Sequence, residues 1–184
     1  MQRNSERILD EYLVSAARAG DSASLSRLVQ RWQPRLLRHA WRLLGDPERA
    51  RDLVQESWLQ ILRGLWRLDD AVAFPAWAFR IVTRRCQRAL LGTRHDHDGG
   101  EALAMLAAPE AGADGESTAE HATVRAAMRT LPAPQRSALA LFYLEDLSVA
   151  EIAIALDVAP GTVKTRLMHA RRKLRALLEG ESNE

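Results

Sequence analysis

Residues 147–177 read LSVAEIAIALDVAPGTVKTRLMHARRKLRAL, and this stretch decides the fold of the C-terminal part of the chain. The run Ser148–Glu151 has the form of a capping box, in which the serine hydroxyl accepts from the glutamate amide and the glutamate side chain reaches back. Leu147 and Ile152 are placed for the accompanying hydrophobic staple. The pattern therefore predicts a short helix that begins at this cap and ends near Asp157.

A turn at Val158-Ala159-Pro160-Gly161 is expected to lead into a longer, basic helix that Thr162 opens. Residues at three- and four-residue spacing predict its inward face: Val163, Leu167, Ala170, Leu174 and Leu177. The outward face then holds Thr165, Met168, His169 and Arg172, with Lys164 and Arg171 at its flank. A short helix, a tight turn and a longer basic helix predict a helix-turn-helix that reads DNA in the major groove. The later bases Arg171, Arg172, Lys173 and Arg175 suit phosphates.

Apolar residues at helical spacing also predict helices in the N-terminal half. One stripe comprises Leu25, Leu28, Val29, Trp32 and Leu36, and a second comprises Ala50, Leu53, Val54, Trp58, Ile61, Leu62 and Leu65. Gly45-Asp46-Pro47 separates the two. A third helix is expected from about Phe74 to Leu91, although Arg85 falls on its apolar side. An N-terminal helix around Ile8, Leu9, Tyr12 and Leu13 is expected to pack on this group.

The distribution of charge divides the chain. Residues 1–98 carry 17 Lys and Arg against 12 Asp and Glu, whereas residues 99–124 carry five acids and no Lys or Arg. Glycines punctuate this acidic strip, which is typical of an extended linker, with a short helix possible at 101–108. We therefore expect an all-α protein with two small helical domains, at 1–94 and 123–184, joined by a flexible acidic linker at 95–122.

Other features restrict the class of protein. Cys86 is the only cysteine, which excludes a disulfide framework and favours a small buried residue in a reducing compartment. The first twenty residues contain Arg3, Glu6 and Arg7 and no signal-peptide core, so the expected location is cytoplasmic, without membrane insertion. His95-Asp96-His97-Asp98 lacks ligand partners at metal-site spacing, so we expect no metal and no cofactor. We see no constellation of catalytic residues, so we do not expect an enzyme.

Two runs of sequence now support a resemblance. Residues 123–179, with GTVKTRLMHARRKL at their centre, resemble the fourth-region domain of the extracytoplasmic-function (ECF) sigma factors of the sigma-70 family. Residues 12–94, notably DLVQESWLQILRGLWRL and FPAWAFRIVTRR, are similar to the second-region domain of that family. The resemblance implies an alternative sigma factor that binds bacterial RNA polymerase core at the beta-prime clamp and the beta flap. It also implies recognition of promoter DNA and an anti-sigma factor held between or around the domains.

Residue roles follow from this resemblance. The N-terminal domain would melt the minus-10 element and the C-terminal domain would read the minus-35 element. The residues that carry core binding would be Asp52, Gln55 and Glu56, and those at the minus-10 element would be Arg80, Arg84, Arg85 and Arg88. At the minus-35 element they would be Thr162, Lys164, Thr165, Met168, His169, Arg171 and Arg172.

The sequence also departs from the family. The usual pattern has Asn where Arg84 stands and Asp where Arg88 stands, so a family contact to an extruded base does not carry over. The tryptophans, all in the first domain, favour core packing over base stacking, and Trp77 is expected to orient the melting helix. Two alternatives stay open: a helix-turn-helix regulator that binds DNA without polymerase, and a sigma mimic that sequesters an anti-sigma factor.

Overall fold

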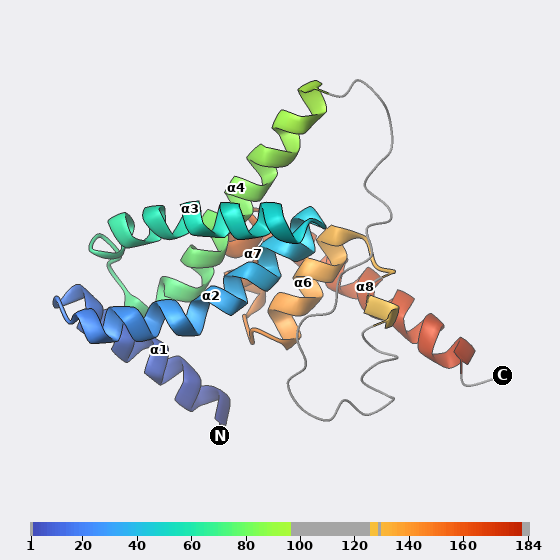
Figure 1. Cartoon of the computed structure of the whole chain (residues 1–184). Coiled ribbons are helices and arrows are strands. Elements are labelled where there is room, and N and C mark those ends of the chain that lie inside the picture. Colours follow the sequence, from blue (N-terminus) through green and yellow to red (C-terminus); the bar gives the residue numbers. More distant parts are fainter. Residues whose placement is uncertain (1, 97–125, 129, 182–184) are drawn as a thin grey trace.

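The computed structural model describes residues 2–96, 126–128 and 130–181, and every regular element in these ranges is helical (Figure 1). The N-terminal group consists of α1 (Gln2–Arg18), α2 (Ser22–Leu44), α3 (Pro47–Leu65), the 3-10 turn η1 (Ala71–Ala73) and α4 (Phe74–Asp96). The C-terminal group consists of α6 (Ala133–Tyr143), α7 (Val149–Leu156) and α8 (Pro160–Glu181). The expected all-α architecture is confirmed. Among the described helices, none combines the length and the apolar character needed to cross a membrane.

Local sequence signals fix the junction between α2 and α3. Gly45 ends α2 in the left-handed region with φ 74°, a conformation that glycine adopts without a steric penalty. Asp46 then caps α3 by accepting hydrogen bonds from the amides of Glu48 and Arg49, and Pro47 occupies the first turn. The predicted break at Gly45-Asp46-Pro47 is confirmed.

The core of the N-terminal group forms around Trp32 of α2. Its ring lies edge-on to Phe74 at 5.1 Å and to Phe79 at 5.6 Å between centroids, so α2 is fixed against α4. Trp58 is also buried, and Trp41 and Trp77 are half-buried against the same core. Core packing is therefore confirmed for these four tryptophans, whereas Trp66 is 52% exposed.

The inward face of α1 differs from the expected one. Leu13 is buried, as predicted, but Ile8, Leu9 and Tyr12 are exposed. The helix instead turns Asp10 inward, where its carboxylate accepts hydrogen bonds from Arg31, Trp32 and Arg35 of α2. These hydrogen bonds to Asp10 set the rotation of α1 about its axis. Apolar spacing alone therefore predicted the wrong inward face for this helix.

Two helix boundaries also differ from the prediction. α4 continues to Asp96, five residues beyond Leu91, and α8 begins at Pro160 rather than at Thr162. Proline suits a first helical turn because its missing amide has no partner there, so Pro160 opens the helix instead of closing the turn. Most of the expected linker, with the possible helix at 101–108, lies outside the described residues. So do His97 and Asp98.

The two groups pack directly on one another. The most extensive contact between helices is that of α4 with α7, and α2 also lies against α6. Buried side chains of both groups belong to one continuous apolar cluster. In Figure 1, α7 accordingly lies behind α4, and α6 lies beside the end of α2. The C-terminal group therefore sits against the face of α4 that carries the arginine stripe.

Candidate nucleic-acid interface

The helix-turn-helix is held by the predicted cap. The Ser148 hydroxyl accepts from the Glu151 amide at 3.2 Å, and the Glu151 carboxylate accepts from the Ser148 amide at 2.7 Å. Leu147 and Ile152 are both buried beside this cap. Asp157 ends α7 in the left-handed region with φ 56°, and its amide donates to the carbonyls of Ala153 and Ile154. The capping box and the end of the short helix are confirmed.

The inward face of α8 holds this helix against α6 and α7. Val163, Leu167 and Ala170 are buried, and Leu174 is half-buried. The side chains on the opposite face are exposed, and they include Thr162, Lys164, Thr165, Met168 and Arg172. The hydroxyl of Thr165 donates to the Gly161 carbonyl at 3.1 Å, so this side chain is tied to the first turn. The predicted division of α8 into an inward and an outward face is confirmed.

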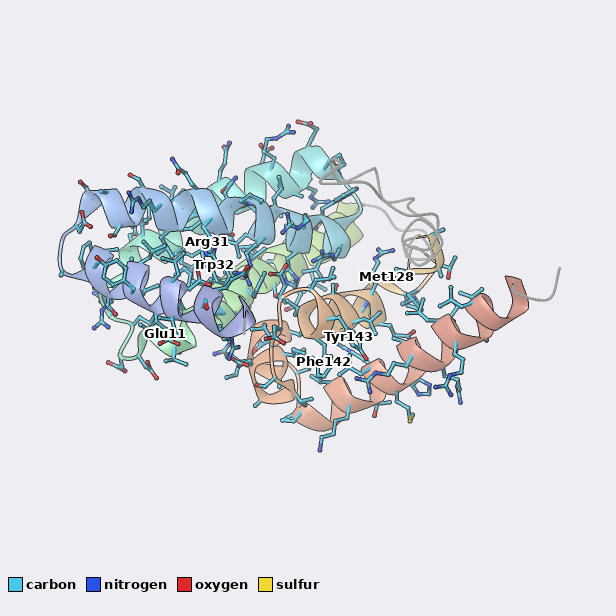
Figure 2. The ribbon with its side chains drawn as sticks, turned by 90° about the horizontal axis from the view of Figure 1, so that it is seen from below. Glu11, Arg31, Trp32, Met128, Phe142 and Tyr143 are labelled. Atoms are coloured by element: carbon cyan, nitrogen blue, oxygen red, sulfur yellow. The ribbon has the colours of Figure 1, made fainter. Side chains whose placement is uncertain are left out.

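Several of the basic or ring side chains on α8 interact within the C-terminal group. The Arg171 Nε donates to the Tyr143 hydroxyl at 3.0 Å, and its guanidinium lies 5.3 Å from the Phe142 ring centroid. Figure 2 shows Phe142 and Tyr143 in the region between α6 and α8. His169 pairs with Arg172 at 3.2 Å between ring and guanidinium nitrogens. The positions of Arg171 and His169 are therefore set by neighbours rather than by solvent alone.

An apolar groove lies along the same side of the C-terminal group. It has a volume of about 540 Å³, and its walls include Leu139, Leu144, Leu174 and Leu178. Leu144 is 60% exposed and adds apolar surface beside the groove. Arg171 and Arg175 of α8 also line the groove, so it borders the basic side of that helix.

The arginine stripe of α4 is engaged by the other group. Arg80 donates to the Asp157 carboxylate at 3.0 and 3.2 Å, and Arg84 donates to the same carboxylate at 3.2 and 3.4 Å. The hydrogen bond from Arg84, followed by that from Arg80, holds the pKa of Asp157 below its usual value. Arg88, one turn further along α4, is exposed. One carboxylate thus sits between two guanidinium groups that the sequence assigned to DNA.

Arg85 lies on the other side of α4. Its Nη1 donates to Glu56 of α3 at 2.6 Å, and its side chain is half-buried. This contact explains why Arg85 fell on the apolar side of the predicted helix: it reaches across to α3. Asp52, Gln55 and Glu56 are all exposed on the face of α3 opposite Val54 and Trp58, as expected.

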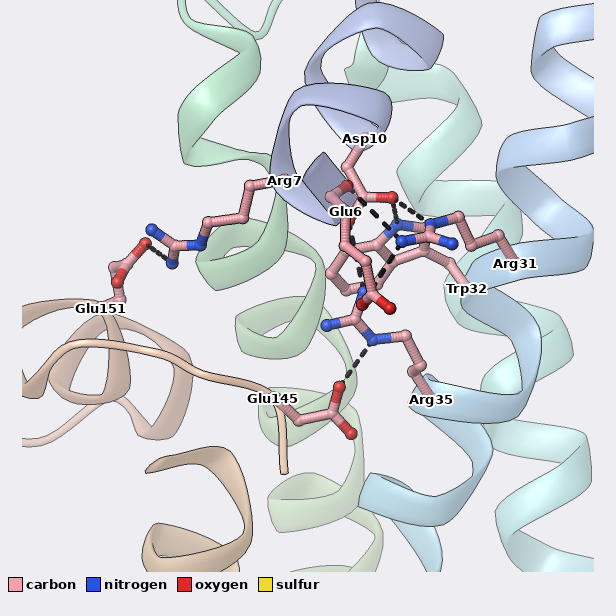
Figure 3. Close-up of polar contacts among 8 residues, drawn as sticks. All are labelled: Glu6, Arg7, Asp10, Arg31, Trp32, Arg35, Glu145 and Glu151. Carbon is pink, nitrogen blue, oxygen red and sulfur yellow. Dashed lines mark hydrogen bonds and ion pairs between the residues drawn. The ribbon is translucent and has the colours of Figure 1, made fainter. Parts of the chain in front are cut away.

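A chain of buried ion pairs joins the two groups (Figure 3). Asp10 accepts from Arg31 at 2.6 Å and from Arg35 at 3.3 Å, and Arg35 also donates to Glu145 at 2.6 Å. Asp10 and Glu145 are only 4% and 5% exposed, so these carboxylates depend on their arginine partners. Glu151 of the capping box accepts a further bond from Arg7 at 2.7 Å.

Asp157 is the residue that the sequence analysis missed. The sequence pattern predicts only the end of a helix at this residue, whereas its partners lie 73 and 77 positions away along the chain. An aspartate that caps a helix gives no local signal of such a contact. Cys86, by contrast, is 1% exposed, and burial raises the pKa of its thiol to about 12, in line with the expected structural role.

The chain matches two families in the order that the domains suggested. The family described as Sigma-70 region 2 matches residues 28–95, and that described as Sigma-70, region 4 matches residues 121–174. The RNA polymerase sigma-H factor of Pseudomonas aeruginosa is 28% identical over 183 residues, with 92% of this chain and 94% of that protein covered. The ECF RNA polymerase sigma factor EcfG of Rhodopseudomonas palustris is 35% identical over 148 residues, with 79% and 80% covered.

Solved structures share the fold. The sigma factor RpoE of Bartonella quintana, in complex with the anti-sigma factor NepR, has a TM-score of 0.62 at 24% identity, with 84% of this chain and 96% of that chain covered. CnrH, in complex with the cytosolic domain of CnrY, has a TM-score of 0.61 at 23% identity, with 94% and 98% covered. At these identities the likeness concerns the arrangement of the helices.

Proposed function

This chain belongs to the ECF family of RNA polymerase sigma factors and acts as an alternative sigma factor in transcription, and from that premise we propose how its surfaces divide the work. The observation that carries the proposal is the separation of polar faces on three helices. α8 exposes a face of basic and polar side chains, and α4 carries a stripe of arginines. α3 exposes a face of acidic and amide side chains. Each face lies opposite a buried apolar stripe; on α4, Arg80 and Arg84 are paired with Asp157, whereas Arg88 is exposed.

The outward face of α8 reads the minus-35 element. Thr162, Lys164, Thr165 and Met168 lie in the first half of the helix, the part that enters the major groove in a helix-turn-helix. Free amides at the helix N-terminus favour a nearby phosphate. Arg172 lies two turns beyond Thr165 and contacts the phosphate backbone of the DNA. Arg171 and His169 lie beside it and contribute to the same DNA-reading face of α8. Base contacts then come from Lys164 and Met168.

The stripe of α4 binds the minus-10 region. Arg80, Arg84 and Arg88 recur at four-residue spacing, which places three guanidinium groups along one line of the helix. Such a line can follow a phosphate backbone. Arg85 lies closer to α3 and contributes from the edge of this surface.

The exposed face of α3 binds the polymerase core at the beta-prime clamp through Asp52, Gln55 and Glu56. The beta flap is assigned to the C-terminal domain, where the apolar groove beside Leu144 borders the DNA-reading face at Arg171. Binding of an apolar partner segment would cover a leucine that is otherwise 60% exposed.

An anti-sigma factor is the expected regulatory partner. A structural relative, the Bartonella quintana RpoE, is described in complex with the anti-sigma factor NepR. A binding site between or around the two domains would give such a partner access to both DNA-reading faces.

Reconstituted transcription tests the proposal. The purified chain, mixed with core RNA polymerase from a related bacterium and a library of promoter fragments, should yield transcripts from a defined subset that core alone does not produce. The two alternatives give different results. A helix-turn-helix regulator would bind a palindromic site without polymerase, and a sigma mimic would yield no transcript at all.

A further inference from the structure

Arg80 and Arg84 lie one helical turn apart on the same face of α4. In the structure this face is occupied by the end of α7, which belongs to the other domain. The Asp157 carboxylate accepts four hydrogen bonds there, two from each arginine, at 3.0 to 3.4 Å. Carboxylate and phosphate oxygens offer arginine the same bidentate geometry. Asp157 therefore occupies a position in which a DNA phosphate would be bound.

Two further ion pairs join the two domains, in the same sense of charge as the contact of Asp157 with Arg80 and Arg84. Arg35 of the first domain pairs with Glu145, and Arg7 pairs with Glu151. With Asp157, three acids of the second domain thus face arginines of the first. The pairs differ in burial: the Arg35 and Glu145 side chains are 17% and 3% exposed, whereas those of Arg84 and Asp157 are 47% and 35% exposed. The contact on the α4 stripe is the one that water, salt and DNA can reach.

The separation of the two promoter elements is larger than this arrangement of the domains can span. The centres of a minus-35 and a minus-10 element lie on the order of 25 base pairs apart, which is about 85 Å along a duplex. Here the turn that leads into α8 touches α4 through Asp157, and α8 with its 22 residues is about 33 Å long. The two DNA-reading faces therefore cannot contact both elements in this arrangement, and the Asp157 contact must break before they do.

We propose that the DNA-reading face of α4 is also the docking surface for the helix-turn-helix domain of the same chain, with Asp157 as a phosphate mimic that competes with promoter DNA for Arg80 and Arg84. The inference rests on the proposed function, in which these arginines contact DNA. It gives a role to Arg84, which stands where the family pattern has Asn: the second guanidinium completes the cradle for the carboxylate. The free chain is thereby held closed until a stronger partner separates the domains.

The test uses the full-length chain and the substitution Asp157→Asn. Asparagine tolerates the left-handed backbone that Asp157 adopts at φ 56°, so the end of α7 keeps its conformation while the charge is lost. Asp69→Asn is the control for the loss of one surface carboxylate, because Asp69 is exposed in the segment between α3 and η1. Dyes on cysteines introduced at Ser26 and Ala176 report the distance between the domains by energy transfer, and the buried Cys86 stays unlabelled.

Two readouts decide the result. Asp157→Asn should lengthen the dye distance and bind a short duplex of random sequence roughly threefold to tenfold more tightly than the wild type, because exposed ion pairs are individually weak. The salt dependence of binding should also steepen, since two more arginines meet phosphates. Asp69→Asn should change neither readout, and adding Arg80→Gln and Arg84→Gln to Asp157→Asn should remove the gain in affinity.

Other outcomes would overturn the inference in distinguishable ways. If Asp157→Asn changes neither distance nor affinity, the carboxylate does not hold the closed form. If the domains separate but DNA binding is unchanged, there is no competition for the arginines. The proposed role of α4 itself fails only if Arg80→Gln with Arg84→Gln leaves promoter opening by the holoenzyme intact.

Discussion

Arg85 of α4 and Glu56 of α3 form a hydrogen-bonded ion pair, with 2.6 Å between Nη1 and Oε2. The pair joins a side chain assigned to promoter DNA with one assigned to the polymerase core. The Arg85 Nε is buried and has no hydrogen-bond partner among the described residues, so Glu56 provides the contact that positions this guanidinium. The Glu56 side chain is 59% exposed, so this carboxylate is accessible from solvent.

The first prediction concerns this face of α3. Replacing Gln55 and Glu56 together with Ala should weaken binding to core polymerase by roughly tenfold or more, because both polar side chains face outward. The far-ultraviolet circular dichroism should be unchanged, and the free energy of unfolding should change by no more than about 1 kcal/mol, since only an exposed ion pair is lost. A titration of fluorescent core polymerase measures the affinity. Gln60→Ala, also at an exposed position of α3, is the matched control, and equal affinity for all three proteins would contradict the assignment.

A second prediction concerns Gly64 at the end of α3. A Cβ atom at this position would lie 2.7 Å from Cζ2 of Trp77, which is too close for two carbon atoms. Alanine favours a helix over glycine by roughly 1 kcal/mol, but overpacking costs about 1–3 kcal/mol. We therefore expect Gly64→Ala to lower the free energy of unfolding by about 1 kcal/mol, as measured by urea denaturation.

The control for this substitution lies in the other domain. A Cβ atom at Gly161, in the first turn of α8, would meet nothing within 4 Å. Gly161→Ala should therefore leave stability unchanged or slightly increased. If both variants lose the same free energy, loss of glycine rather than contact with Trp77 would be the cause. Trp77 would then have no part in setting the approach of α4 to α3.

Local patterns predicted most of the fold. The capping box at Ser148 and the break at Gly45-Asp46-Pro47 appear in the structure because each rests on hydrogen bonds between residues at most a few positions apart. The same locality explains the correct inward face of α8. The division of α3 into a buried and an exposed face also follows from spacing alone.

Contacts between distant residues could not be predicted in this way. The rotation of α1 depends on Asp10 meeting Arg31 and Arg35, and apolar spacing carries no information about such a buried carboxylate. The docking of Asp157 on Arg84 depends on the packing of two domains. The sequence assigned Arg84 to DNA from its place in a stripe, which describes the surface of one helix but not what covers it.

A third prediction concerns the pH dependence of stability. Burial lowers the pKa of His39 to about 3, and the neighbouring charge of Arg42 acts in the same direction. The imidazole bonds to the buried Thr83 hydroxyl at 2.8 Å and stays neutral in the folded protein. In the unfolded chain the pKa is about 6.5, so below that pH the unfolded state binds the extra proton. Stability attributable to His39 should therefore fall as the pH drops from 6.5 towards 3, by about 2 kcal/mol at pH 5.

The variant His39→Gln isolates this effect. Glutamine can keep a hydrogen bond to Thr83 but does not titrate, so its unfolding free energy should vary less between pH 7 and pH 5 than that of the wild type. The measured quantity is the difference in slope, which is insensitive to a constant loss from altered packing. Parallel curves for the wild type and His39→Gln would rule out the linkage.

The last prediction concerns how α8 reads a promoter. Val163, Leu167 and Ala170 are buried, which fixes the rotation of the helix and turns Lys164 and Met168, the latter 55% exposed, away from the core. Lys164 can donate to guanine acceptors, and Met168 can rest on a thymine methyl group. Removing either side chain should cost about 1–3 kcal/mol at the preferred base and relax selection at one or two positions.

Arg172 is expected to behave differently, because it lies two turns after Thr165 and pairs with His169 at 3.2 Å. From there its guanidinium meets the phosphate backbone, which carries no sequence information directly. Arg172→Ala should therefore weaken binding to all promoters alike and reduce the slope of log affinity against log salt by about one. Selection from a library randomised at the minus-35 element, with holoenzymes carrying Lys164→Ala, Met168→Ala or Arg172→Ala, separates the two kinds of contact. The first two should change the selected sequence and the third should retain it at lower affinity, whereas identical sequence preferences for all four proteins would show that neither Lys164 nor Met168 reads a base.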